Sequence, residues 1–116
     1  MKTKLFFTVS IFTFCIILFW GCSTKSGVTP PANTGSSVSI QNYAFVPDTL
    51  TITKGSTVTW TNSDNVTHTV YEQNTVFSSG NLTPGNTYSF TFPNVGNYIY
   101  YCQIHSMMKK AIVIVK

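Results

Sequence analysis

Hydrophobic and polar residues alternate with a period of two along most of the chain beyond residue 36. In the segment 57–61, for example, Val58 and Trp60 share one face and threonines occupy the other. Alternation of this kind, rich in Thr, Val, Tyr and Phe and interrupted by turn residues, is typical of strands that are buried on one side. Because no helical stripe runs through this part, we expect an all-β sandwich or barrel. The pattern predicts further strands at 38–40, 49–53, 67–71, 87–92, 97–101 and 111–115.

The first 21 residues show a different pattern. Lys2 and Lys4 precede an apolar stretch from Leu5 to Trp20, which is short for a membrane-spanning helix of about 20 residues. A basic start, an apolar centre and a small residue at the end are typical of a secretory signal peptide. We therefore predict a signal peptide at 1–21, and an exported protein on the periplasmic or cell-surface side.

The dipeptide Gly21-Cys22 favours a signal peptide of the lipoprotein type. Cleavage before Cys22 would leave a cysteine ready for acylation, so we expect a lipid anchor at Cys22 that holds the protein on a membrane. A plain signal peptide or an uncleaved anchor is the alternative.

The next segment, 22–36, consists mainly of Ser, Thr, Gly and Pro. It is predicted to be a flexible tether, because these residues offer almost nothing to a core. One small domain, 37–116, remains, near the lower size limit for folding without a disulfide or a metal. Its single cysteine, Cys102, has no partner for an internal disulfide. A bound metal is the natural substitute, since its binding energy adds to the free energy of folding.

Charge argues against one class of partner. The formal net charge is +4, all cations are lysines, and two of them belong to the predicted signal peptide. No long basic run exists, whereas nucleic-acid binding usually needs a clustered basic face. We therefore expect no nucleic-acid partner and only modest electrostatic steering of protein partners.

Four potential metal donors lie in two segments. Cys102, His105 and Met108 follow the penultimate predicted strand at regular spacing, and His68 follows a polar loop. A thiolate, two imidazoles and a weak thioether form the ligand set of a blue-copper electron-transfer site. If the strands that carry them end side by side, the four side chains converge. Met107 is a rival for the axial position, and the residue types alone do not decide between the two methionines.

Each donor also has an ordinary interpretation. Cys102 can be a buried free thiol, His68 and His105 can be surface residues, and Met108 can fill a gap in the core. The combination makes the metal site the stronger interpretation. Zinc is disfavoured, because structural zinc sites use more thiolate or imidazole and no methionine.

These segments resemble the cupredoxins, and in particular the small amicyanin-like and plastocyanin-like blue copper proteins. The likeness covers residues 37–116 and includes Phe45-Val-Pro47, Gly55–Asn62, Phe77–Gly80, Pro84-Gly85, Phe90-Thr-Phe92, Gly96-Asn-Tyr98 and Ile112–Val115. The resemblance implies a Greek-key β-sandwich that binds one type 1 copper ion through His68, Cys102, His105 and an axial Met108. The spacing between Cys102 and Met108 is that of the amicyanin-like loop, which favours Met108 over Met107.

Two positions depart from the family pattern. Ile104 stands where relatives often have a proline, which makes the loop less stiff. Thr69 stands where many relatives have an asparagine that ties the two ligand loops together. We expect the Thr69 hydroxyl to make the same tie, although the threonine side chain is shorter. Because bonds around the ligands tune a metal as well as hold it, these departures are expected to affect the reduction potential.

The resemblance implies an electron carrier, not an enzyme, that passes single electrons between redox partners by Cu(II)/Cu(I) cycling. Protein partners are expected to dock on the monomer near His105, through an apolar rim of Ile104, Met107 and either Val46 or Pro47. A copper carrier without electron transfer is the main alternative. A Cys–His hydrolase and a purely structural sandwich are weaker ones, and two histidines are too few for the extra metal centres of a copper oxidase or reductase.

Overall fold

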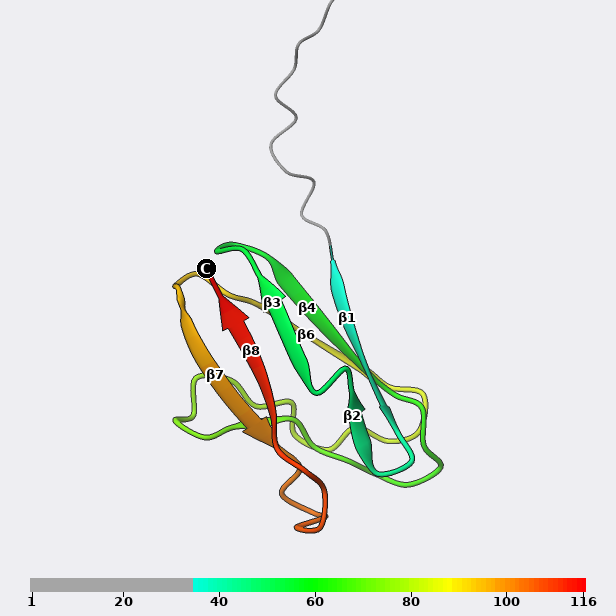
Figure 1. Ribbon diagram of the computed structural model, residues 1–116. Helices are drawn as coiled ribbons and strands as arrows, with labels where there is room; N and C mark the ends of the chain where they lie inside the picture. The colour runs from blue at the N-terminus through cyan, green and yellow to red at the C-terminus, as the bar shows by residue number, and fades with distance from the viewer. Residues whose placement is uncertain (1–34) are drawn as a thin grey trace, which may run out of the picture.

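The computed structural model describes residues 35–116, which form an all-β sandwich without a helix (Figure 1). The predicted signal peptide, Cys22 and nearly all of the predicted tether lie outside these residues. From residue 35 onward, no helix is long and apolar enough to cross a membrane. The strands are β1 (Ser36–Gln41), β2 (Ala44–Val46), β3 (Thr49–Ile52), β4 (Thr57–Asn62), β5 (Tyr71–Glu72), β6 (Thr87–Thr91), β7 (Gly96–Tyr101) and β8 (Ala111–Val115).

The strands form two four-stranded sheets. The first has the spatial order β2-β1-β4-β6, and the second has the order β3-β8-β7-β5. β1 is parallel to β4 and β3 is parallel to β8, whereas the other neighbouring strands are antiparallel. Neighbours such as β1 and β4 are not consecutive in the chain, so the connections cross from one sheet to the other, as they do in Greek-key sandwiches. The predicted fold class is confirmed.

The two sheets enclose an aromatic core centred on Trp60, whose side chain is fully buried. The centroid of its ring system lies 5.4 Å from that of Phe77, 5.5 Å from that of Tyr100 and 6.4 Å from that of Phe92. Each large side chain buried in this way stabilises the fold by roughly 1.5–3 kcal/mol relative to leaving it exposed. Aliphatic side chains complete the core: Val38, Ile40, Ile52, Val58, Val70, Leu82, Val113 and Val115.

Most of the predicted strands lie where the alternating pattern indicated them. The segment 111–115 matches β8 residue for residue, and the other confirmed strands differ from the prediction by one or two residues at an end. β2 was not predicted, because three residues are too few to show a period of two. The hairpin that it forms with β1 is nevertheless important to the site described below.

The predicted strand at 67–71 is wrong. β5 begins only at Tyr71, and His68 lies in a loop where it forms an isolated antiparallel bridge with Leu82. His68, Thr69 and Val70 are all buried, and three consecutive buried side chains do not fit a strand with one solvent-facing side. Val70 belongs to the hydrophobic core, so this segment packs inward instead of continuing β5.

The loop that carries the predicted ligands Cys102, His105 and Met108 lies at one end of the sandwich (Figure 1). It joins β7 to β8, which are paired up to Tyr100 and Ala111. The start of β1 and the C-terminus lie at the opposite end (Figure 1). The end that carries the site is therefore remote from the point at which the preceding chain enters the domain.

Candidate metal centre

The loop that carries His68 is held by a buried amide. The Asn62 side chain is fully buried at the end of β4. Its Nδ2 donates to the carbonyl oxygens of Val66 (2.7 Å) and Leu82 (2.8 Å), and its Oδ1 accepts from the backbone N–H of Asp64 (3.0 Å). One amide thus satisfies three backbone groups, which gives the loop after β4 a single conformation.

His68 is fixed both through its backbone and through its ring. Its N–H donates to the Leu82 carbonyl (3.0 Å) and its carbonyl accepts from the Leu82 N–H (2.8 Å). The fully buried imidazole donates from Nε2 to Asp64 Oδ2, at 2.8 Å. Because an ionised carboxylate only accepts, Nε2 carries the proton and Nδ1 presents its lone pair to the interior.

Asp64 is suited to this role because it is ionised. Burial raises the pKa of Asp64, but the backbone N–H groups of Tyr43 and Asn42 and the ring of His68 outweigh burial and hold that pKa below its usual value. A carboxylate that receives a histidine N–H sets the orientation of the ring and raises its basicity as a metal ligand.

The second ligand segment is the loop from Cys102 to Lys110. Cys102 follows the last residue of β7, and its side chain is 2% exposed. A turn follows, in which the Met108 N–H donates to the His105 carbonyl at 3.0 Å. This turn brings Met108 back toward His105, and His105 itself remains half-buried.

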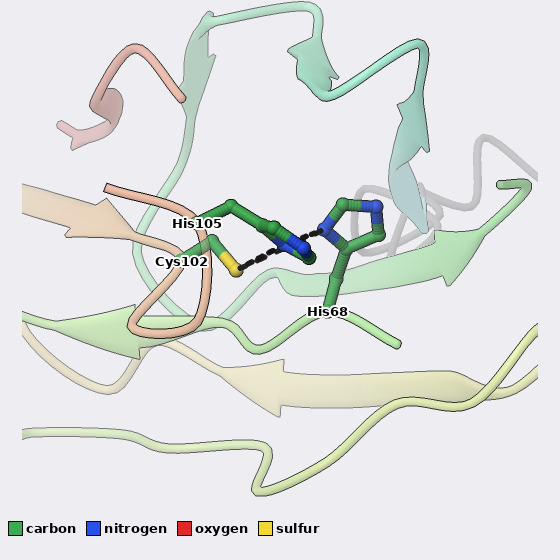
Figure 2. Close-up of side chains that lie close together, drawn as sticks. All are labelled: His68, Cys102 and His105. Atoms are coloured by element: carbon green, nitrogen blue, oxygen red, sulfur yellow. Dashed lines mark hydrogen bonds between the residues drawn. The ribbon is translucent and has the colours of Figure 1, made fainter. Parts of the chain in front are cut away.

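Three of the four predicted donors converge on one point (Figure 2). Cys102 Sγ lies 3.8 Å from His68 Nδ1 and 3.6 Å from His105 Nδ1, and the two Nδ1 atoms are 3.2 Å apart. Nitrogen and sulfur donors held about 2.0 and 2.3 Å from one ion are separated by roughly 3.3–3.8 Å at tetrahedral to trigonal angles. The three atoms are therefore spaced as a single bound metal ion requires.

Thr69 joins the two ligand loops. The backbone N–H of Gln103 donates to Thr69 Oγ1 at 2.8 Å, which confirms the predicted tie. Thr69 also faces the sulfur of Cys102, with its N–H at 3.4 Å and its hydroxyl oxygen at 3.8 Å. Because both groups point at the sulfur, Thr69 also helps to fix the position of Cys102.

The two methionines of the loop differ sharply in burial. Met108 is 6% exposed, whereas Met107 is 82% exposed. Met108 lines a hollow of about 300 Å³ together with Tyr101, Cys102, Gln103, Ser106 and Lys110. Met108 is therefore turned inward and lines the same hollow as Cys102, whereas Met107 faces outward.

Three residues of this site were not predicted from the sequence. Asp64 was recognised only as a member of a polar loop, Asn62 as a member of that loop and of the family-like segment Gly55–Asn62, and Tyr43 was not singled out. The Tyr43 ring stands edge-on to both imidazoles, with centroids 5.5 Å from His68 and 5.1 Å from His105. The frequency of Asn and Asp in the segment 62–65 was the one available signal, since these residues commonly cap loops with their side chains.

Comparisons with known proteins agree with this arrangement. A family model described as a cupredoxin-like domain matches residues 11–115, which include every described strand and part of the predicted signal peptide. The chain is 35% identical to a plastocyanin of Scenedesmus fuscus over 72 residues, which cover 53% of this chain and 74% of that protein. It is 33% identical to an amicyanin-alpha of Methylorubrum extorquens over 89 residues, which cover 68% of this chain and 71% of that protein.

A solved structure supports the same family. A purple cupredoxin from Nitrosopumilus maritimus superposes with a TM-score of 0.64 and 32% sequence identity, over 70% of this chain and 99% of that one. Across five curated relatives, the matched part spans from 57% to 74% of the relative's length. Fold, donor set and sequence matches agree: the chain belongs to the cupredoxin family, and its cofactor is one type 1 copper ion.

Proposed function

We propose that this cupredoxin carries single electrons between redox partners, with His68, Cys102 and His105 as strong copper ligands and Met108 as the weak axial one. Copper bound there supplies the one-electron Cu(II)/Cu(I) couple. The convergence of two imidazole Nδ1 atoms and one buried sulfur within 4.8 Å is the observation that carries the proposal. Thiolate and thioether suit Cu(I) and imidazole suits both states, so one fixed set of ligands can serve both.

A carrier needs a site that hardly moves when its charge changes. The Asn62 side chain and the backbone bridge to Leu82 hold His68 in place. Thr69 then links that loop to the Cys102 loop through the N–H of Gln103. Held in this way, the ligands have little freedom to rearrange, which favours rapid electron transfer over metal exchange.

The burial of Met108, in a hollow that Cys102 also lines, supports Met108 as the axial ligand. Met107 is exposed and fits a different role, as part of an apolar rim. Ile104 and Val46, 49% and 44% exposed, belong to the same class of outward-facing apolar side chains. We propose that protein redox partners dock on this rim and exchange electrons through the half-exposed ring of His105.

An enzymatic role has less support. A Cys–His hydrolase needs a thiol that its substrate can reach, and the Cys102 side chain is 2% exposed. With His68 and His105 both at one centre, the chain has no further histidine for the additional metal sites of a copper oxidase. The alternative that keeps the same ligands is a copper carrier without electron transfer.

We further propose that the protein is exported and lipid-anchored through Cys22, and that it acts as a monomer. Because β1 enters the sandwich at the end opposite the Cys102 loop (Figure 1), a tether at the N-terminus leaves the proposed docking rim free. A mature protein that carries no lipid at Cys22 when it is purified from membranes would contradict this anchor.

Voltammetry and electron self-exchange together test the proposed function. A carrier gives one reversible one-electron wave and rapid exchange between its Cu(I) and Cu(II) forms, as measured by NMR line broadening. Met107→Glu is expected to slow this exchange several-fold without moving the potential. Val95→Glu is the matched control, because Val95 is also exposed (63%) but lies in the turn before β7. Slow exchange in the unmodified protein, with copper readily lost to a chelator, would instead identify a copper carrier.

A further inference from the structure

The β1–β2 hairpin turn has an unfavourable sequence for its conformation. Gln41 and Ala44 are paired, and the two residues between them, Asn42 and Tyr43, have φ angles of 51° and 56°. A two-residue turn with both φ angles positive strongly prefers Asn followed by Gly. Asn42 fits this preference, but Tyr43 occupies the position that glycine would take without strain. Strained backbone of this kind persists where the surrounding structure holds it, and it is often functional.

The surrounding structure holds this turn through Asp64. Its Oδ1 accepts the N–H of Asn42 at 2.6 Å, and its Oδ2 accepts the N–H of Tyr43 at 3.0 Å. The same Oδ2 accepts the Nε2–H of His68 at 2.8 Å. One carboxylate, with its side chain 12% exposed, therefore connects the strained turn to a copper ligand.

The position of the Tyr43 ring explains why a tyrosine occupies the turn. The ring is nearly perpendicular to both imidazoles, at 82° to His68 and 88° to His105. Edge-to-face contacts at these separations are favourable in their own right. Tyr43 is 43% exposed, so it contacts both rings and also reaches the protein surface.

We propose that Asp64 and Tyr43 are positioning residues for the copper site: Asp64 fixes the His68 tautomer and the turn, and Tyr43 packs against the two imidazoles and limits their rotation. This inference rests on the proposed function and deepens it. The negative charge of Asp64 acts through the His68 ring, where it favours the higher charge of Cu(II) over Cu(I). The contacts made by Tyr43 slow the departure of His105, the less buried of the two histidines.

The variant Asp64→Asn tests the role of the carboxylate. An amide has one acceptor oxygen, so it cannot accept all three N–H groups. We expect copper affinity to fall about 10–100-fold, as it does when partners of metal ligands are removed. We also expect the potential to rise, by about 59 mV if Cu(II) loses tenfold more affinity than Cu(I). Nitrogen-15 NMR of the metal-free protein should show the Nε2–H tautomer at His68 in the unmodified chain and a mixture of tautomers in the variant.

Asp48→Asn is the matched control. It removes the same charge from a carboxylate that is 47% exposed and paired with Lys109, so solvent screening should leave affinity and potential nearly unchanged. Equal effects of the two variants would overturn the role assigned to Asp64. A missing voltammetric wave in the unmodified protein would instead refute electron transfer, while the tautomer measured without metal would still test the inference.

The variant Tyr43→Gly tests whether the Tyr43 ring positions the two imidazoles, separately from the backbone strain of the turn. Glycine relieves the strain of the turn, which offsets the loss of the ring contacts, so the thermal midpoint of the metal-free protein should change little. The rate at which a chelator removes copper should rise several-fold. Thr75→Gly is the control, because Thr75 also has a positive φ of 63° and lies in the turn after β5, where its N–H donates to the Glu72 carbonyl at 2.9 Å. If Tyr43→Gly releases copper no faster than Thr75→Gly, Tyr43 does not position the ligands.

Discussion

The two segments that supply the proposed copper ligands are built in opposite ways. The His68 loop is buried from His68 to Val70 and is held by side-chain amide and carboxylate groups, namely Asn62 and Asp64. The Cys102 loop is mostly exposed. Its turn is closed by the hydrogen bond from the Met108 N–H to the His105 carbonyl. One histidine is therefore fully buried, whereas the other lies half-exposed on a loop at the surface.

This difference in burial fits the roles that we propose for the two histidines in electron transfer. A ligand held on all sides limits the change in geometry when the charge of the site changes. A ligand at the surface provides a short route for an electron to a docked partner. The comparison implies that changes at His68 should damage the structure of the site, whereas changes at His105 should mainly open it to solvent.

Replacing each histidine by glycine is expected to have the largest effect. His68→Gly leaves a buried cavity and removes one of the three N–H groups that Asp64 accepts, so we expect a loss of about 2–5 kcal/mol in the free energy of unfolding of the metal-free protein. His105→Gly should cost much less, and added imidazole should enter from solvent and restore the copper spectrum. Denaturant unfolding and an imidazole titration measure both effects. Equal rescue of the two variants would mean that the two ligands are equally accessible.

Removing the side-chain amide of Asn62 tests whether the His68 loop depends on its hydrogen bonds. Asn62→Ala leaves the carbonyls of Val66 and Leu82 and the N–H of Asp64 without this partner. We expect a loss of about 1–3 kcal/mol in unfolding free energy, which denaturant unfolding will detect. Ser106→Ala, at an exposed position of the other loop, should stay within about 0.5 kcal/mol of the parent. Comparable losses of unfolding free energy in the two variants would contradict the difference described between the two loops.

Replacing the methionines of the Cys102 loop should have the smallest effect, which is a change in the reduction potential alone. Met108→Leu is expected to retain copper and to raise the potential, because the weak donor is replaced by apolar surface that disfavours the higher charge of Cu(II). Met107→Leu should leave the potential unchanged, since Met107 is 82% exposed. Voltammetry of both variants is the measurement. The reverse result would assign Met107 as the axial ligand.

The sequence predicted those parts of the protein that depend on hydrophobic periodicity and on donor type. The strands around Val58 and Trp60 show their buried faces directly, and two histidines with one cysteine leave few alternative ligand sets. The segment at His68 was predicted as a strand because it resembles one locally, but its bridge to Leu82 is a contact between distant parts of the chain. Tyr43 and Asp64 were missed for the same reason, because only the folded chain brings the hairpin turn against the loop after β4.

The visible and EPR spectra of the copper-loaded protein, compared with those of Cys102→Ser, test the central claim most directly. If Cys102, His68 and His105 bind one copper ion, the oxidised protein shows an intense visible band and a type 1 EPR signal. Both should disappear in Cys102→Ser, because serine cannot supply the thiolate bond. A colourless protein that nevertheless holds one equivalent of copper, or an unchanged spectrum in Cys102→Ser, would contradict the account.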